Sequence, residues 1–244
     1  MSDVDQSRRH FVGWGSAALA GIAIAPGFLL YDYAHGKPPA QGADPKVRWG
    51  LLVDTTRCKP GCHDCVDACN REHHLPGTTR ATDAQWIRKI DLTGLRGSPS
   101  HSLPMMCQHC ADPPCVDVCP TGASFKRDDG IVLVDKHTCI GCRYCMMACP
   151  YQARSFVHEP TTGQGTDTPR GKGTVESCNL CVHRVDAGRI PACVEACDAA
   201  GHRAMVFGDL NDPGSEISRR VREVASREIR ADLRLGTGVR YQGL

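Results

Sequence analysis

The 244-residue sequence predicts an α+β fold made of a duplicated unit, with short β-hairpins, short helices and many loops. The first observation is an internal repeat. The run LLVD at 51–54 and the run VLVD at 132–135 each precede a dense group of cysteines, which begins four residues after the aspartate. The second is composition: aromatic residues make up 5%, whereas sixteen cysteines fall into four groups of four. We therefore expect a small core that the cysteines help to hold together.

The strongest motif lies in 131–150. Its cysteines Cys139, Cys142, Cys145 and Cys149 follow the pattern C-x2-C-x2-C-x3-C-P, which is typical of proteins that bind a cubane [4Fe-4S] cluster. Three cysteines two residues apart let one tight loop place thiolates at three corners of a cube. The fourth cysteine lies one helical turn later, and in two-cluster proteins it ligates the other cluster.

Three related motifs contain the other twelve cysteines. Their spacings are C-x3-C-x2-C-x3-C, C-x2-C-x4-C-x3-C-P and C-x2-C-x11-C-x3-C in chain order. The first has one extra loop residue, and the last has Asp198 where proline is usual. Motif, hairpin and motif is the plan of a two-cluster bacterial ferredoxin, so we expect duplicated bacterial-ferredoxin-like units around four [4Fe-4S] clusters. The cysteines are Cys58, Cys62, Cys65 and Cys69; Cys107, Cys110, Cys115 and Cys119; and Cys178, Cys181, Cys193 and Cys197.

Short elements are expected between the motifs. The segments 94–100 and 158–174 are predicted to be loops, the second of them exposed and rich in Thr, Gly and Pro. A helix is expected from about Ser215, with Ile217, Val221 and Val224 on one face, and 235–244 has no recognisable motif. Strands are expected at 51–54, 85–90, 123–126, 131–135 and 205–207, the third and fourth of them paired as a β-hairpin.

Structural zinc and disulfides are the alternative uses of the cysteines. Zinc sites usually separate two C-x2-C pairs, whereas the third motif packs four cysteines into eleven residues. Cysteines two residues apart are also too close to pair sensibly as disulfides. A zinc- or disulfide-stapled binding protein is thus a remote alternative. His63 and His109 lie inside motifs, and we expect them to be solvated or hydrogen-bonded near cluster sulfurs rather than metal ligands.

An export signal is predicted at 1–36. The sequence SRRHF at 7–11 fits the twin-arginine pattern S-R-R-x-F and precedes the uncharged stretch 12–30. That stretch is rich in Gly and Ala and is broken by Pro26, which favours a signal over a transmembrane anchor. We therefore expect a periplasmic protein, exported after folding around its cofactors; cleavage of the signal and its retention as an anchor both stay open.

The sequence contains no set of residues typical of an enzyme. There is no glycine-rich nucleotide loop, no nucleophile–base pair and no flavin motif. The net charge of +2, without a run of Lys or Arg, gives no reason to propose nucleic acid as a partner. The cations Lys126, Arg127, Arg143 and Arg184 flank the motifs and either offset cluster charge or form a solvated face. We therefore expect a chain that passes single electrons and leaves bond chemistry to a partner.

The order of the four motifs resembles the four-cluster ferredoxin subunits of the dimethylsulfoxide-reductase type, over nearly the whole chain after the predicted signal. Within that group the sequence most resembles the DsrO type, the exported ferredoxin-like subunit of a sulfite-reductase-associated membrane complex. The stretches behind this likeness are RWG at 48–50, QWI at 85–87, PACVEA at 191–196 and FGDLNDP at 207–213. The last two are shared with related subunits such as that of tetrathionate reductase.

The resemblance implies that each motif gives its last sulfur to a neighbouring cluster. No cysteine position is missing, so it implies four [4Fe-4S] clusters rather than a three-iron variant. The implied ligand sets are Cys58, Cys62, Cys65 and Cys197; Cys69, Cys178, Cys181 and Cys193; Cys107, Cys110, Cys115 and Cys149; and Cys119, Cys139, Cys142 and Cys145.

The resemblance also implies partners in sulfur metabolism. These are an integral membrane, quinone-reacting subunit of the NrfD type and an exported multihaem cytochrome c, with the chain membrane-associated through them. The alternative partner is a molybdopterin-containing catalytic subunit, as in tetrathionate or polysulfide reductases. The expected organisation is a signal at 1–36, a linker at 37–46, a four-cluster ferredoxin domain at 47–210, and a C-terminal helix and tail at 211–244.

Overall fold

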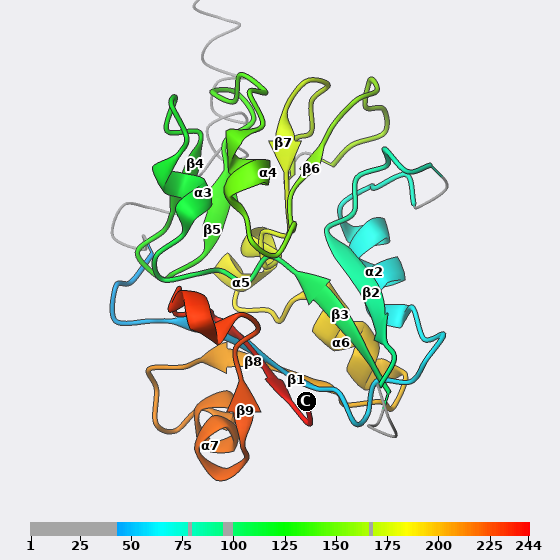
Figure 1. The fold of residues 1–244 in the computed structure, drawn as a ribbon, viewed down its shortest axis with the longest axis vertical. Coiled ribbons are helices and arrows are strands. Elements are labelled where there is room, and N and C mark those ends of the chain that lie inside the picture. Colours follow the sequence, from blue (N-terminus) through cyan, green and yellow to red (C-terminus); the bar gives the residue numbers. More distant parts are fainter. Residues whose placement is uncertain (1–42, 78–79, 95–99, 166–167) are drawn as a thin grey trace, which may run out of the picture. The chain divides into compact units, whose positions relative to one another are not determined.

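The structure is a computed structural model that describes residues 43–244, apart from 78–79, 95–99 and 166–167 (Figure 1). The predicted export signal, residues 37–42 of the predicted linker and most of the loop expected at 94–100 lie outside the described residues. None of the helices in the described part combines the length and the hydrophobicity that crossing a membrane requires.

A four-stranded sheet with the order β8-β1-β10-β9 forms one side of the described part (Figure 1). Its central strand β1 (Trp49–Asp54) is an apolar run whose residues 50–54 are all buried, because both faces of the strand are covered. β8 (Met205–Asp209) pairs with it antiparallel, and β10 (Val239–Gln242) pairs with it parallel. The strands predicted at 51–54 and 205–207 are therefore confirmed.

The C-terminal segment completes this sheet. Residues 235–244 carry no motif, yet β10 inserts between β1 and β9 (Ser226–Arg227), and 43–244 forms one compact unit. Before β10, the Gly238 amide donates to the carbonyl of Gln108 at 2.8 Å. The Arg48 guanidinium donates to the carbonyls of His109 and Gly130. These bonds tie the start and the end of the described chain to the loop of the second cysteine motif.

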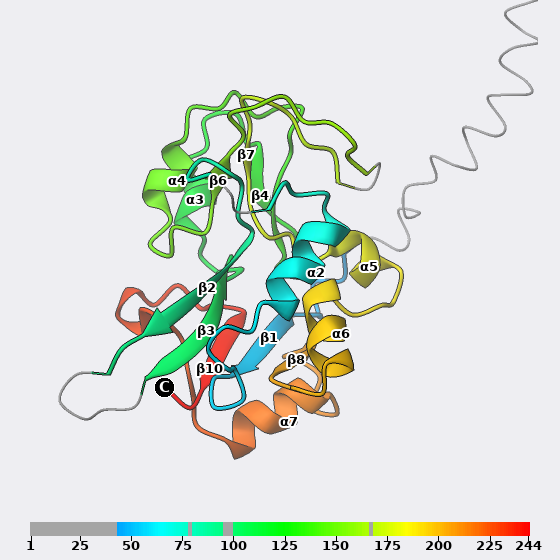
Figure 2. The ribbon, with the colours of Figure 1, turned by 90° about the vertical axis from the view of Figure 1, so that its right-hand side faces the viewer.

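Two short helices pack beside β1 and β8 (Figure 2). α2 (Asp64–Glu72) has Asp64 and Asp67 in its first turn, where negative charge favours the helix dipole. It packs against α6 (Ala192–Ala199), which follows the short α5 (Val182–Asp186). We call β1, α2, α6 and β8 the outer repeat, because in the sequence they enclose a second set of similar elements.

That second set repeats the same plan. β4 (Ser124–Lys126) and β5 (Val132–Val134) pair antiparallel, and α3 (Pro114–Asp117) packs against α4 (Tyr144–Ala148). We call these four elements the inner repeat; in the sequence it lies between the two halves of the outer repeat. The predicted hairpin is confirmed, and β5 stands before its cysteine loop as β1 does.

Two further strand pairs and a helix complete the fold. β2 (Ile87–Leu92) pairs antiparallel with β3 (His101–Met106), close to the strand predicted at 85–90. The predicted C-terminal helix is confirmed as α7 (Glu216–Glu223), where Ser215 caps the first turn by accepting from the Ser218 amide. The other elements are the strands β6 (Ser155–Phe156) and β7 (Val175–Glu176), and the 3-10 turn η2 (Ala231–Leu233), which follows α7 and β9.

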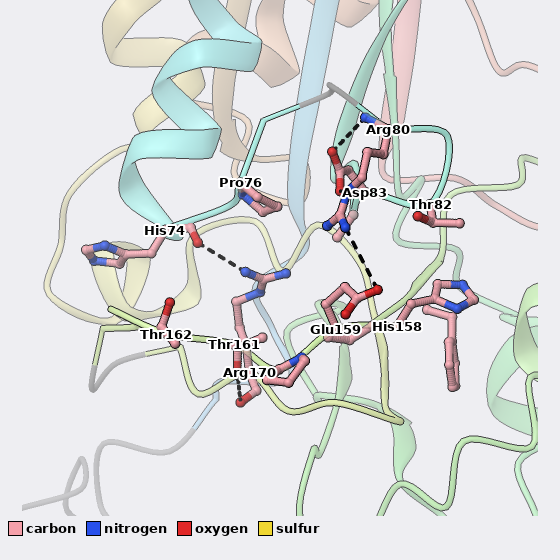
Figure 3. A pocket seen from close by; sticks show the side chains of 14 residues that line it. His74, Pro76, Arg80, Thr82, Asp83, His158, Glu159, Thr161, Thr162 and Arg170 are labelled. Atoms are coloured by element: carbon pink, nitrogen blue, oxygen red, sulfur yellow. Dashed lines mark hydrogen bonds and ion pairs between the residues drawn. The ribbon is translucent and has the colours of Figure 1, made fainter.

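The prediction that 158–174 is simply an exposed loop is wrong in part. Its Arg170 is 8% exposed and forms a two-pronged ion pair with Glu176, which is fully buried. The same guanidinium donates to the carbonyl of His74 after α2 (Figure 3). Arg170 therefore anchors this segment to the residues that follow α2. The polar composition of the segment gave no sign of this anchor.

The substitution Glu176→Gln tests this anchor. It leaves the buried Arg170 without its counter-charge, so we expect the free energy of unfolding to fall by about 3 kcal/mol. For a chain of this size that corresponds to about 6–12 °C in Tm, followed by circular dichroism on anaerobic protein.

Glu216→Gln is the matched control. Glu216 is exposed and lies 4.0 Å from Arg220, and we expect its loss to change stability by no more than about 0.5 kcal/mol. Equal, small effects of the two substitutions would contradict the anchoring role of Arg170 and Glu176.

Candidate iron–sulfur cluster sites

All sixteen cysteines lie in the described part, and all are unpaired thiols. The structure brings them together in four sets of four, the same sets that the resemblance implies. We number the sets along the molecule. Site 1 is Cys58, Cys62, Cys65 and Cys197; site 2 is Cys69, Cys178, Cys181 and Cys193; site 3 is Cys107, Cys110, Cys115 and Cys149; site 4 is Cys119, Cys139, Cys142 and Cys145.

Site 1 gathers two cysteines from the loop before α2, one from the first turn of α2 and one from α6. Burial raises the pKa of the Cys65 thiol to about 12. Lys89 opposes that rise, whereas the neighbouring thiols of Cys58, Cys197 and Cys62 add to it. A buried group of thiols loses its protons to solvent only when cations bind the resulting thiolates, and the irons of a cluster provide such cations.

Site 2 is buried throughout. Burial raises the pKa of the Cys69 thiol well above its usual range, and the nearby Cys178, Cys193 and Cys181 raise it further. The Nε2 atom of His73 lies 3.3 Å from the Cys181 sulfur. Burial also lowers the pKa of His73 to about 3, so the ring is neutral at pH 7 and can offer the sulfur one N–H. This is the kind of contact that we expected of the histidines.

Sites 3 and 4 each surround a small hollow in the inner repeat. The cysteines of site 3 come from the loop before α3, from α3 and from the end of α4. Those of site 4 come from the segment after α3, from the loop before α4 and from α4. Among the other residues that line the hollows are Arg154 and Tyr151 at site 3, and Ser124 and Val175 at site 4.

The helices explain the exchange of ligands between sites. On α2, Cys65 and Cys69 lie one turn apart and belong to sites 1 and 2. On the neighbouring α6, Cys193 and Cys197 belong to sites 2 and 1, in the reverse order. In the inner repeat, α4 carries Cys145 to site 4 and ends at Cys149 of site 3, whose backbone is extended. Each helix thus connects two adjacent sites.

The four sites adjoin one another in the order 1, 2, 3, 4. Cys65 of site 1 is close enough to Cys69 of site 2 to affect its pKa. In the same way Cys178 of site 2 affects the pKa of Cys107 of site 3, and Cys115 of site 3 affects that of Cys145 of site 4. Sites 2 and 3 are therefore the middle pair, and sites 1 and 4 are the ends.

The donor set fits a cubane cluster better than single zinc ions. Thiolates at about 2.3 Å from a tetrahedral zinc lie about 3.8 Å apart. Within the described residues, no group of three cysteines has its sulfurs within 4.8 Å of one another. The sulfurs also accept backbone N–H bonds, as thiolates of metal clusters do, for example from Ser124 to Cys119 at 3.3 Å and from Ala204 to Cys197 at 3.3 Å. All sixteen cysteines are unpaired thiols, so the structure gives no support to the disulfide alternative.

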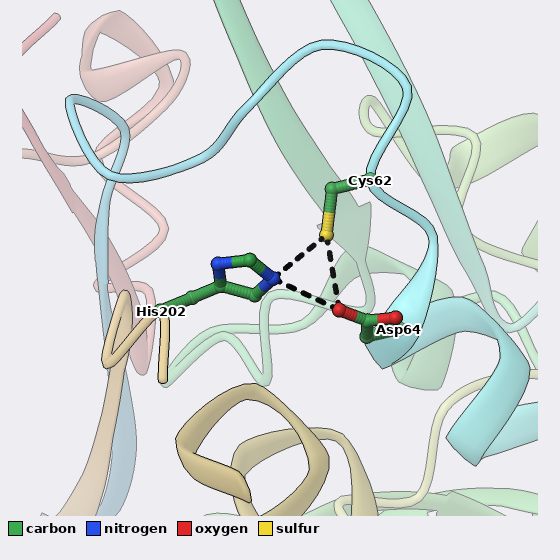
Figure 4. Close-up of side chains that lie close together, drawn as sticks. All are labelled: Cys62, Asp64 and His202. Atoms are coloured by element: carbon green, nitrogen blue, oxygen red, sulfur yellow. Dashed lines mark hydrogen bonds and ion pairs between the residues drawn. The ribbon is translucent and has the colours of Figure 1, made fainter. Parts of the chain in front are cut away.

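One compact group of possible metal ligands occurs at site 1 (Figure 4). Asp64 and His202 lie 2.9 Å apart through Oδ2 and Nε2. The Cys62 sulfur is 3.4 Å from Asp64 and 3.6 Å from His202. Because Cys62 belongs to site 1, we interpret this group as hydrogen-bonding partners of a cluster ligand. No motif pointed to it, since His202 lies far from the first cysteine motif in the sequence.

The histidines and cations singled out in the sequence have structural partners. His109 is buried, and its Nδ1 accepts from the Val132 amide at 3.0 Å; burial lowers its pKa to about 3. His63 is exposed and precedes α2. Arg127 pairs with Asp129 and Asp186, Arg184 pairs with Glu72 and Glu195, Arg143 lies over the Phe156 ring, and Lys126 donates to the Ala111 carbonyl. The buried cation Arg154, at sites 3 and 4, was missed.

Comparison with known proteins identifies the family. A family model described as a 4Fe-4S dicluster domain matches residues 100–210. The chain is 40% identical to the Hdr-like menaquinol oxidoreductase iron-sulfur subunit 1 of Archaeoglobus fulgidus, over 98% of each chain. The chain belongs to this family of 4Fe-4S iron–sulfur subunits. The predicted resemblance is thereby confirmed at the level of the family, and the DsrO assignment stays a prediction.

Other members are of similar relatedness. A tetrathionate reductase subunit of Salmonella typhimurium is 37% identical, over 88% of this chain and 79% of its own. Protein NrfC of Escherichia coli is 40% identical over 78% of each chain. The likeness therefore extends well beyond the matched domain and includes the first cysteine motif.

Two double variants test the exchange of ligands. Cys119→Ser with Cys142→Ser removes two ligands of site 4, so we expect the loss of one cluster, about four irons per chain. Cys142→Ser with Cys149→Ser removes one ligand each from sites 4 and 3, so we expect two clusters to be lost or converted. Iron and sulfide analysis, with EPR of the reduced protein, measures both.

A different result is expected if Cys149 ligates the same cluster as the cysteines next to it in the sequence. If Cys149 belonged with Cys139, Cys142 and Cys145, the second double variant would alter a single cluster. That result would contradict the ligand sets given above.

Proposed function

We propose that this chain is the electron-transfer subunit of a membrane-associated redox complex and binds four [4Fe-4S] clusters at sites 1 to 4. In this proposal the sixteen cysteines are the ligands, and the chain has no substrate site of its own. The observation that carries the proposal is the gathering of the cysteines into four adjacent sets. Bound clusters supply one-electron redox chemistry.

The exposure of the cysteines supports a path with two open ends. Every cysteine of site 2 is buried, and so are three of the four at site 3. At site 4, Cys142 is exposed, and at site 1, Cys58 and Cys62 are partly exposed. The chain would therefore keep water away from the middle of the path and let redox partners approach at sites 1 and 4.

We propose the DsrO-like arrangement for the partners. One end would meet an integral membrane, quinone-reacting subunit of the NrfD type, and the other a multihaem cytochrome c of sulfur metabolism. The relative named as a menaquinol oxidoreductase subunit, similar over its whole length, supports a quinol-linked complex. The twin-arginine pattern at 7–11 supports export to the periplasm. The direction of electron flow stays open in this proposal.

The second candidate is the electron-transfer subunit of a molybdopterin oxidoreductase. It is favoured by the 37% identity to the tetrathionate reductase subunit. The two candidates share the clusters and the export signal, and they differ in the partner that exchanges electrons with one end of the chain.

Purification of the intact complex distinguishes the candidates. A C-terminally tagged chain is isolated from its own host in mild detergent under anaerobic conditions. We expect a membrane subunit, c-type haem in the absorption spectrum, and reduction of the clusters by added quinol. Molybdenum with a large catalytic subunit, and no haem, would favour the second candidate. A chain that purifies without any redox subunit would contradict both.

The variant Arg8→Lys, Arg9→Lys is the matched control for export, because it keeps the charge of the signal. We expect the variant to stay in the cytoplasm with its clusters bound and to be absent from the periplasmic side of the membrane fraction. Normal export of the twin-lysine chain would contradict the assignment of 7–11 as a twin-arginine signal.

A further inference from the structure

Arg154 is buried where sites 3 and 4 meet. Its side chain is 6% exposed, and its Nη2 donates to the sulfur of Cys115 at 3.0 Å and to the hydroxyl of Ser124 at 2.8 Å. Cys115 belongs to site 3. Ser124 lines site 4, and its backbone amide donates to the sulfur of Cys119, a site 4 cysteine, at 3.3 Å. The same cation therefore contacts a cysteine of site 3 and a residue that lines site 4.

No carboxylate of the described residues forms an ion pair with Arg154. Its Nε and Nη1 atoms are buried and have no hydrogen-bond partner among the described residues, and the side chain lines the hollow of site 3. A buried charge without a counter-charge is strongly unfavourable. Sulfur ligands of bound clusters, which carry net negative charge, would meet this need.

The cation near site 2 differs in this respect. Arg184 affects the pKa of Cys181, but its guanidinium pairs with both Glu72 and Glu195. Its positive charge is therefore largely compensated by carboxylates. At sites 3 and 4, in contrast, no carboxylate of the described residues compensates the charge of Arg154, so this charge acts on the cysteine sulfurs.

We propose that Arg154 is a shared counter-charge of sites 3 and 4 and raises the reduction potentials of both clusters relative to the same sites without it. Reduction adds one electron to a cluster, and a buried cation favours the more negative state because little water screens it. Arg154 would thus favour electrons in the half of the path that ends at the exposed Cys142. This inference rests on the proposed function, since it requires clusters at these sites.

EPR-monitored redox titration of the full chain, loaded with clusters, tests the proposal. Dithionite is the electron donor, and wild type is compared with Arg154→Gln, which removes the charge. We expect the equilibrium constant for reduction to fall about tenfold or more for two of the four clusters, which lowers their reduction potentials by about 59 mV for one electron. Arg154→Lys retains the charge and should stay closer to wild type. Midpoints unchanged in Arg154→Gln, or shifted equally in all four clusters, would overturn the proposal.

Arg143→Gln is the matched control. Arg143 is also a cation beside site 4, but it is exposed and lies over the Phe156 ring, so we expect solvent to screen its effect. A shift as large as that of Arg154→Gln would attribute the effect to general charge and contradict the proposal. In the Cys119→Ser, Cys142→Ser double variant, which lacks the cluster of site 4, we expect Arg154→Gln to shift the potential of one cluster, that of site 3.

The experiment separates this inference from the proposed function. A wild-type chain without clusters refutes the function, whereas four clusters with unchanged potentials in Arg154→Gln refute the role of Arg154 alone. If Arg154→Gln does not retain its clusters, wild type with ¹⁵N in the arginine side chains is measured by pulsed EPR after reduction. A ¹⁵N coupling that disappears in Arg154→Lys supports the contact with Cys115, and its absence in wild type overturns the proposal.

Discussion

Two cysteines one helical turn apart on a short helix belong to different sites, and the rest of the structure depends on this arrangement. Cys65 and Cys69 on α2 face the reversed pair Cys197 and Cys193 on α6. The two helices must therefore lie side by side, although the 119 residues from 73 to 191 separate them in the sequence. The inner repeat has the same constraint between α3 and α4. The ligand pattern explains both the duplicated architecture and the close spacing of neighbouring sites.

The same arrangement explains how a chain with few aromatic residues forms a core. The main buried cluster of side chains contains cysteines of all four sites beside Leu51, Val53, Trp86 and Tyr241. Because burial raises the pKa of most of these thiols, buried thiolates are stable in this core only when metal replaces the protons on their sulfurs. We therefore expect folding and cluster binding to be coupled.

The sequence was sufficient for the features that depend on local spacing. The cysteine motifs, the hairpin β4–β5, the strands β1 and β8 and the helix α7 follow from short-range patterns. Features that depend on distant partners were not predictable. β10 carries no motif because its partner β1 lies at the other end of the described chain. Arg170 lies in a polar segment, and its contacts with Glu176, six residues later, and with the distant His74 explain its burial. Arg154 went unnoticed because its role depends on two cysteine sets meeting around it.

The central claim is that sixteen cysteines hold four cubane clusters. Iron and acid-labile sulfide per chain, measured on anaerobically purified and cluster-loaded protein with EPR before and after reduction, tests it most directly. The account predicts about 16 of each per chain, with coupled cubane signals on reduction. Zinc without sulfide, or a full set of iron-free thiols in folded protein, would contradict it.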